Sequence, residues 1–173
     1  MSELEEAWEV ALAEAKQRAR AGGRADIARY LDLRAQNDLL RRAAVDWLTS
    51  TLTSLAADAN RKGSGIQIEK QDEHSFRVGA ATMVGPQLTL RNGVRALTFE
   101  SGWPRTPRDG FVHRGGLACA NIKHFGRRRL NIELKLTQSP KGSPQWFLLQ
   151  KDDTWSLITE ASLRAQLSIL TED

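Results

Sequence analysis

The stretch PQLTLRNGVRALTFE, residues 86–100, decides the fold class. Apolar and polar residues alternate on both sides of the dipeptide Asn92-Gly93. Such alternation is typical of a half-buried β-strand. Asn-Gly between two alternating runs predicts a tight two-residue turn, because both residues accept positive φ. The stretch therefore predicts an antiparallel hairpin with one apolar face.

The alternating pattern extends over residues 65–157 and predicts six to eight strands. No helical pattern separates them, so we expect an antiparallel sheet, because parallel neighbours need a long crossover. One face is expected to be apolar and covered by helices; its residues include Phe76, Val78, Leu88, Leu97, Phe99, Leu130, Ile132 and Leu134. The opposite face is expected to be polar and open to solvent; it carries Arg77, Thr98, Glu100, Glu133 and Lys135.

Helical periodicity occupies the two ends of the chain. Residues 1–60 predict a helical pair broken at Gly22-Gly23, and residues 159–171 predict a C-terminal helix capped by Thr159. The second helix would be about 54 Å long. Either residues 35–38, AQND, break it, or one end projects and packs against another chain. The sequence thus predicts a single α+β domain over residues 1–173, with a homodimer through the N-terminal helices as an option.

Composition narrows the functional class. The chain has 173 residues, a net charge of +4 and one cysteine, Cys119. No apolar run is long enough to cross a bilayer, and the acidic N-terminus is unlike a signal peptide. A single cysteine suits a reducing compartment. We expect a cytoplasmic protein without membrane contact, and no phosphate-loop or dinucleotide motif indicates a cofactor.

Positive charge is concentrated in residues 103–129, which hold seven basic residues and one acidic residue. Aromatic residues lie among them. Arginine binds phosphate and aromatic rings stack on bases, so the segment predicts contact with an anionic partner, nucleic acid being favoured over an acidic protein surface. The other interpretation is a solvated basic loop. The candidate binding residues are Arg105, Arg108, Arg114, Lys123, Arg127, Arg128, Arg129, Trp103 and Phe125.

A second pattern joins Asp109 to Glu133 and Lys135. Read with Pro107, it resembles the P-D…(D/E)-x-K signature of a large nuclease superfamily. The resemblance implies that the two carboxylates hold a divalent metal while the lysine activates water. The other interpretation is an ordinary exposed Glu and Lys on the polar side of a strand.

A third group, His113, Cys119 and His124, offers a metal site or a cysteine nucleophile with a histidine base. Its spacings match no zinc signature, and a structural zinc site needs four ligands. Cys119 lies in an apolar alternation where a buried thiol is the common occupant. We assign no metal and no catalytic residue to this group.

Taken together, these patterns predict a non-catalytic binding or adaptor protein whose basic segment engages an anionic partner. Two alternatives remain open. One is a metal-dependent nuclease using Asp109, Glu133 and Lys135. The other is a structural or assembly subunit that dimerises through its N-terminal helices.

Overall fold

The computed structural model describes residues 3–172. The chain divides into two compact units, residues 1–40 and residues 41–173. Three helices and one antiparallel sheet of seven strands confirm the predicted α+β class. No helix of the described residues is long and apolar enough to cross a bilayer.

The first unit contains the predicted helical pair. Helix α1 spans Glu3–Ala21, and helix α2, Ala25–Arg61, begins in this unit. The break falls at Gly22-Gly23, as expected. Helix α2 runs without interruption through residues 35–38, so the sequence AQND does not break it.

Charge pairs join the two helices of this unit. The Asp32 carboxylate on α2 forms ion pairs with Lys16 and Arg20 on α1. The hydrogen bond from Lys16 holds the pKa of Asp32 below its ordinary value. The contact fixes an antiparallel hairpin of helices.

In the second unit, the strands form a meander in which each strand pairs with the next one in the chain. The strands are β1 Gln67–Val78, β2 Ala81–Asn92, β3 Arg95–Gly102, β4 Ala118–His124, β5 Ile132–Gln138, β6 Pro144–Leu149 and β7 Trp155–Leu157. The predicted β2–β3 hairpin is present, with its turn shifted by one residue. Asn92 pairs with Arg95, so the two turn residues are Gly93 and Val94, and Gly93 has a φ of 61°. Glycine at the first turn position satisfies the positive φ required there.

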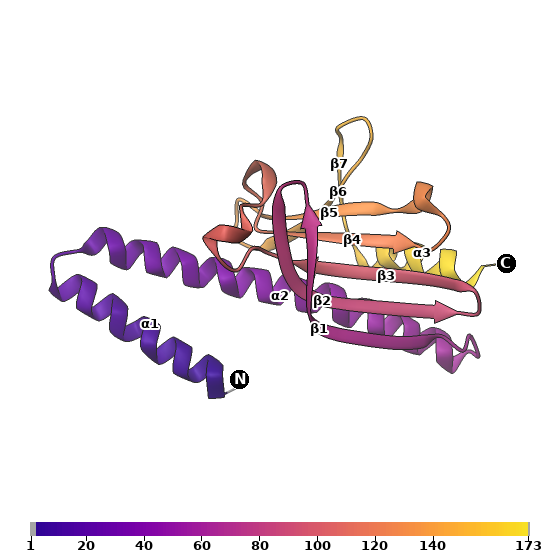
Figure 1. Ribbon diagram of the computed structural model, residues 1–173, viewed down its shortest axis with the longest axis horizontal. Helices are drawn as coiled ribbons and strands as arrows, with labels where there is room; N and C mark the ends of the chain where they lie inside the picture. The colour runs from indigo at the N-terminus through magenta and orange to yellow at the C-terminus, as the bar shows by residue number, and fades with distance from the viewer. Residues whose placement is uncertain (1–2, 173) are drawn as a thin grey trace. The chain divides into compact units, whose positions relative to one another are not determined.

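One face of the sheet, the inner face, is covered as predicted by helices (Figure 1). These are residues 41–61 of α2 and the C-terminal helix α3, Glu160–Thr171. The Trp146 indole on β6 donates a hydrogen bond of 3.0 Å to the carbonyl of Ala44 on α2. The buried side chains of this core include Leu48, Leu52, Leu88, Leu90, Leu97, Phe99, Ile122, Leu134, Leu136, Leu163 and Leu167.

Helix α3 begins where the sequence predicted. The Thr159 hydroxyl accepts a hydrogen bond of 3.3 Å from the backbone N–H of Ser162. Leu163, Leu167 and Leu170 form its buried face. The cap and the apolar stripe therefore fix both the start and the orientation of the helix.

The opposite face, the outer face, is partly covered by the chain itself. Hairpin β1–β2 bends about halfway along its length (Figure 1), and the β1 pairing register shifts between Gln71 and His74. Two glycines whose backbones touch lie at the bend, where Gly85 pairs with His74. A Cβ at Gly85 would lie 2.0 Å from the Ser101 carbonyl oxygen, and a Cβ at Gly102 would lie 2.3 Å from the Val84 carbonyl oxygen.

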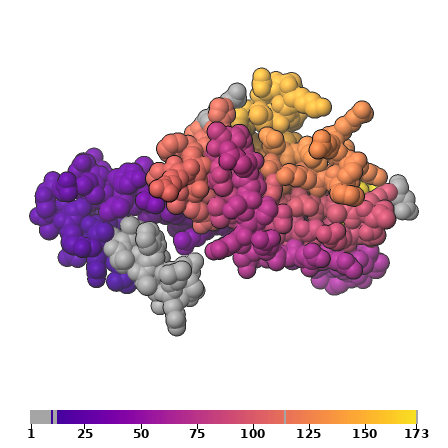
Figure 2. Space-filling model, viewed as in Figure 1, coloured from indigo at the N-terminus to yellow at the C-terminus, as the bar shows by residue number. Residues whose placement is uncertain are grey.

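The bent end of the hairpin packs on the outer face and makes a second, smaller core. This core contains Phe76, Met83, Val112 and Cys119, with Val78 against it. In Figure 2 the hairpin lies directly against the segment that contains Val112. The prediction that Phe76 and Val78 face the helices is therefore wrong, because the register shift and the bend turn them to the other side. The outer face is correspondingly not simply open to solvent.

Strand β5 begins later than expected. Leu130 lies in a short 3-10 turn, Arg128–Leu130, and is 37% exposed, whereas the alternation placed it on the inner face. The arginine run forms a loop before the strand, and the inward alternation starts at Ile132. This difference creates the loop on which the candidate site depends.

Substitution of either touching glycine tests the bend. We expect Gly85→Ala and Gly102→Ala each to lower the free energy of unfolding by roughly 1–3 kcal/mol, because the added methyl meets a backbone carbonyl that cannot rotate away. Urea denaturation measures the change. The control is Thr89→Ala on the same strand, which should cost much less. Wild-type stability of both glycine variants would contradict the close approach.

Candidate functional site

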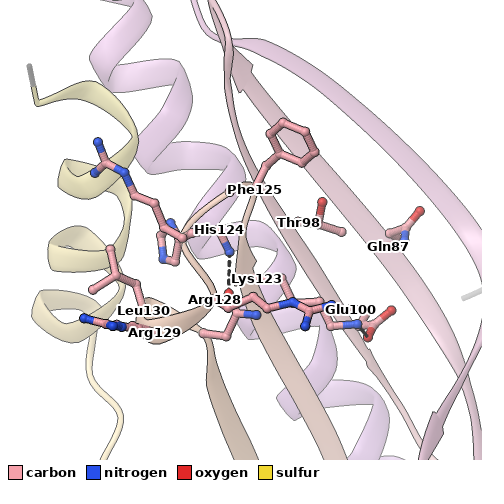
Figure 3. A pocket seen from close by; sticks show the side chains of 12 residues that line it. Gln87, Thr98, Glu100, Lys123, His124, Phe125, Arg128, Arg129 and Leu130 are labelled. Atoms are coloured by element: carbon pink, nitrogen blue, oxygen red, sulfur yellow. Dashed lines mark hydrogen bonds and ion pairs between the residues drawn. The ribbon is translucent and has the colours of Figure 1, made fainter.

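An open pocket of about 1000 Å³ lies on the outer face. Its floor carries Gln87, Thr98, Glu100 and Lys123, contributed by strands β2, β3 and β4. Its wall is the segment of residues 124–131 that follows β4, which we call the basic loop (Figure 3). The pocket therefore combines a polar sheet surface with the predicted arginine run.

Backbone hydrogen bonds hold the basic loop in place. The Asn131 side-chain oxygen accepts a bond of 2.8 Å from the N–H of His124, which closes the two ends of the loop. Inside it, the N–H of Arg127 donates to the His124 carbonyl and the N–H of Leu130 donates to the Arg127 carbonyl, at 3.0 and 2.9 Å. The three arginines are consequently presented by an ordered loop.

The side chains of Arg127, Arg128 and Arg129 are exposed, and no carboxylate among the described side chains forms an ion pair with them. Figure 3 shows Arg128 and Arg129 extending from the loop with Phe125 directed away from them. Three guanidinium groups without internal counterions attract anions, and each can bind a phosphate through two parallel hydrogen bonds.

Phe125 adds an aromatic ring to the same basic loop, on the lining of the same pocket. Its side chain is 77% exposed, while its backbone N–H is bonded to the Ala96 carbonyl at 2.9 Å. An exposed phenylalanine costs free energy that a stacking ligand would recover. The ring is thus available as a stacking surface on a fixed backbone.

A buried carboxylate organises the pocket floor. Glu100 is 3% exposed, and its oxygens accept hydrogen bonds from Lys123 at 2.7 Å, His74 at 2.8 Å and Asn121 at 3.0 Å. Burial by itself raises the pKa of Glu100, but the bonds from Lys123, Asn121 and His74 outweigh it and lower the pKa. Lys123, a predicted binding residue, is therefore neutralised by an internal partner.

The remaining predicted binding residues lie outside this pocket's lining. Trp103 is 6% exposed in the inner core. The Arg105 guanidinium lies 3.7 Å from the centre of the Trp103 ring and donates to the Val84 carbonyl at 3.1 Å. Arg108 is exposed in the 3-10 turn Pro107–Asp109, and the side chain of Arg114 lies outside the described ones. The structure thus gathers Lys123, Phe125 and Arg127–Arg129 and gives Trp103 and Arg105 packing contacts.

The residues of the nuclease pattern occupy two different settings. The Asp109 carboxylate accepts bonds from the backbone N–H groups of Arg105 and Thr106, at 3.1 and 3.0 Å, and caps its own turn. The backbone bond from Thr106 leads the interactions that lower the Asp109 pKa. Glu133 and Lys135 line a second cavity, whose lining does not include Asp109. No group of three or more His, Cys, Asp or Glu among the described residues is placed to hold a metal ion.

The third predicted group is spread over both faces of the sheet. His124 is buried and bonds through Nε2 to the Gln166 oxygen on α3 at 2.9 Å. Cys119 faces the outer side, where burial raises the pKa of its thiol to about 11. A neutral thiol is a poor nucleophile. His113 is exposed in a 3-10 turn, His113–Gly115.

The hydrogen-bond partners of Glu100 were not predicted from the sequence. Gln87, Glu100, Asn121 and Glu133 are successive cross-strand partners on β2, β3, β4 and β5. The alternation placed Glu100 on the polar face, but only the pairing register brings these residues into one row. His74 reaches Glu100 because hairpin β1–β2 bends, and no local sequence signal indicated that contact.

Comparisons with protein-family models, curated proteins and solved structures gave no significant match.

The Glu100 network makes acid stability a test of the floor. Because the pKa of Glu100 in the folded protein lies below its ordinary value, the ionised carboxylate stabilises the fold above that ordinary pKa, and this contribution is lost as pH falls through the folded pKa. We expect Glu100→Gln to cost about 2 kcal/mol at pH 7 and to flatten the loss of stability below pH ~4.5.

The matched control is Glu133→Gln, which removes the same charge from an exposed position on β5, two strands away from Glu100. The variants are compared by thermal unfolding, followed by circular dichroism at pH values from about 3 to about 7. Equal effects of the two substitutions would contradict the role of the buried network.

Proposed function

We propose that this protein binds single-stranded nucleic acid with the basic loop and the polar pocket beside it. The observation that carries the proposal is the grouping of three arginines without internal counterions and an exposed phenylalanine around one open pocket. Arginines along a groove neutralise phosphates, and an aromatic ring stacks on bases irrespective of sequence. The proposal describes a non-catalytic binding or adaptor protein.

Phe125 favours nucleic acid over an acidic protein surface. The carboxylates of an acidic protein would bind through positive charge alone, and the arginines at the rim of the pocket supply that charge to either partner. A 77% exposed ring on the same loop as the arginines adds a contact suited to a flat base. A paired duplex hides its base faces, so a flexible single strand uses both features together.

The floor fits the same ligand. Lys123 is held by Glu100, so the positive potential comes from the rim of the pocket, while the floor offers amide and hydroxyl groups of Gln87 and Thr98. Such groups donate and accept hydrogen bonds without a fixed charge. Phosphates would therefore lie along the basic loop, and bases would point toward the floor. A cytoplasmic location, predicted from the single cysteine, accords with this ligand.

Removal of the three arginines tests the proposal. We expect Arg127→Ala/Arg128→Ala/Arg129→Ala to weaken binding of fluorescent oligo-dT and oligo-U. The slope of log K against log salt should fall in magnitude by about 2, because each phosphate contact on a single strand contributes about 0.7. Fluorescence anisotropy measures both quantities. Phe125→Leu should weaken binding roughly tenfold and leave the slope unchanged, because it removes stacking alone.

The control removes the same charge elsewhere, as Lys62→Ala/Lys141→Ala/Lys151→Ala, all three lysines being exposed. An equal loss in the control would mean that only net charge matters. Binding of polyglutamate as tightly as oligo-dT would favour an acidic protein partner instead. The nuclease hypothesis remains a prediction: cleavage with Mg²⁺ or Mn²⁺ that Glu133→Ala abolishes would support it.

A second function, assembly of two copies through the helical unit, has its own observation. Among the unit's described side chains, only the alanines Ala19 and Ala28 are buried. Larger apolar side chains are exposed, at 59% for Val10, 61% for Tyr30, 56% for Leu33 and 69% for Leu39. These exposed apolar side chains offer a surface that a partner chain could cover.

The sequence of this unit favours a second copy as the partner. Residues 1–14 contain five acidic and no basic residues, whereas residues 15–24 contain four basic and no acidic residues. A two-fold axis can set the acidic half of one α1 against the basic half of the other, so the surface is self-complementary. Two helical hairpins would then form a four-helix bundle.

Sedimentation equilibrium tests this assembly. We expect the wild-type protein to be a dimer at micromolar concentration and Tyr30→Ser/Leu33→Ser to shift it toward monomer at least tenfold in dissociation constant, since both substitutions remove apolar contact area. The control is Val94→Ser, an apolar residue 92% exposed in the β2–β3 turn. A monomeric wild type would rule the assembly out.

A further inference from the structure

A second cavity, separate from the basic pocket, lies on the outer face over strands β4 and β5. Its volume is about 200 Å³, and its lining comes from β1, β4, β5, β6, β7 and the turn at His113. The space can hold several waters and therefore a small organic molecule. Elements distant in the sequence thus converge around a space of small-molecule size.

Two opposite charges stand at this cavity. Glu133 and Lys135 alternate on β5, so their side chains share the outer face with Cα atoms about 7 Å apart. Glu133 is exposed, and no cation among the described side chains forms an ion pair with it. Its carboxylate is therefore available to a cationic group of a ligand.

Lys135 is held in a defined position. A Cβ at Gly116 would lie 2.4 Å from the Lys135 Cε and 2.9 Å from its Cγ, so the lysine stem lies directly against the glycine. Its ammonium lies 5.7 Å from the centre of the Trp155 ring. These contacts orient the ammonium before any ligand arrives, which lowers the entropic cost of binding an anionic group.

The rest of the lining is mostly apolar. Trp155 and Leu149 come from the β6–β7 hairpin, and Val78 comes from the bent end of β1. Trp155 is 40% exposed and Leu149 is 39% exposed, so both retain apolar surface that a ligand can cover. Cys119 adds a neutral thiol, because burial keeps its pKa well above neutral pH. An apolar wall thus faces one fixed cation and one unpaired anion.

We propose that this cavity binds a free α-amino acid with an apolar side chain. The ligand carboxylate contacts the Lys135 ammonium, the ligand ammonium contacts the Glu133 carboxylate, and the apolar side chain lies against Trp155, Leu149 and Val78. An α-amino acid carries both charged groups on one carbon atom, so a single small ligand can bridge the Lys135 ammonium and the Glu133 carboxylate. Small-ligand sites commonly combine apolar walls with a few placed polar groups in this way.

This assignment does not depend on nucleic-acid binding, because the basic loop contributes nothing to the lining. It also gives Glu133 and Lys135 a role different from the metal-dependent one implied by the nuclease resemblance. Both residues act here as charge contacts, with no bond made or broken.

Ligands that lack one charge test the proposal on the wild-type protein. We expect isothermal titration calorimetry to detect L-phenylalanine binding, with phenethylamine and 3-phenylpropionate binding at least tenfold more weakly, because each has lost one ion pair. The first lacks the carboxylate and the second lacks the amine. No binding of L-phenylalanine, L-leucine or L-tryptophan at concentrations on the order of 10 mM would overturn the proposal. Equal affinity for L-phenylalanine and both analogues would also overturn it.

Variants then assign the two charges. Glu133→Gln should reduce L-phenylalanine affinity at least fivefold and leave 3-phenylpropionate affinity unchanged, since that ligand has no amine. Lys135→Gln should likewise reduce L-phenylalanine affinity at least fivefold and leave phenethylamine affinity unchanged, since that ligand has no carboxylate. Lys151→Gln, an exposed lysine outside the lining, is the control and should change neither. If each charge variant lowered the affinity for all three ligands by the same factor, the assigned contacts would be contradicted.

Discussion

The close approach of Gly85 and Gly102 is the constraint on which the outer face depends. Their backbones are too near to admit a Cβ on either residue, and hairpin β1–β2 bends over the sheet beside this contact. Without the bend, His74 would remain in the plane of the sheet, two strands away from Glu100. With it, the two side chains meet at 2.8 Å, and Phe76 and Met83 close a second core against Cys119. The close glycine contact therefore accompanies both the Glu100–His74 bond and the second core on the outer face.

Burial of the Glu100 carboxylate on that face is unfavourable by itself, and nearby hydrogen-bond donors compensate for it. Glu100 is almost inaccessible, yet Lys123 and Asn121 donate to it from β4 and His74 donates to it from β1. A carboxylate with three donors is stabilised in its ionised form, which explains why its pKa falls despite burial. The ion pair with Glu100 also neutralises the positive charge of Lys123. The pocket floor is therefore nearly neutral, and the cationic character is left to the loop at its edge.

The sequence predicted the architecture well because alternation and helix capping are local signals. Asn92-Gly93, Thr159 and the leucine alternation located the hairpin, the last helix and the inner core to within a residue or two. It misplaced Phe76 and Val78 because a register shift and a bend are long-range events. It treated Trp103 as a surface group because composition cannot distinguish a buried ring that packs under an arginine from an exposed one. Glu100 gave no signal, since its ligands come together only through strand pairing.

The two cavities of the outer face differ in how their charges are arranged, and that difference determines the ligand class each can accept. Around the basic loop the unpaired charges have one sign and lie on an exposed rim, so a long polyanion can gain from several of them at once. Around Glu133 and Lys135 the charges have opposite signs, flank a small apolar space and suit a ligand with no net charge. A polyanion gains nothing at the second cavity, because Glu133 opposes what Lys135 attracts. A small zwitterion gains little at the rim, where no anion holds its ammonium. The two proposed ligands would therefore not compete for one site.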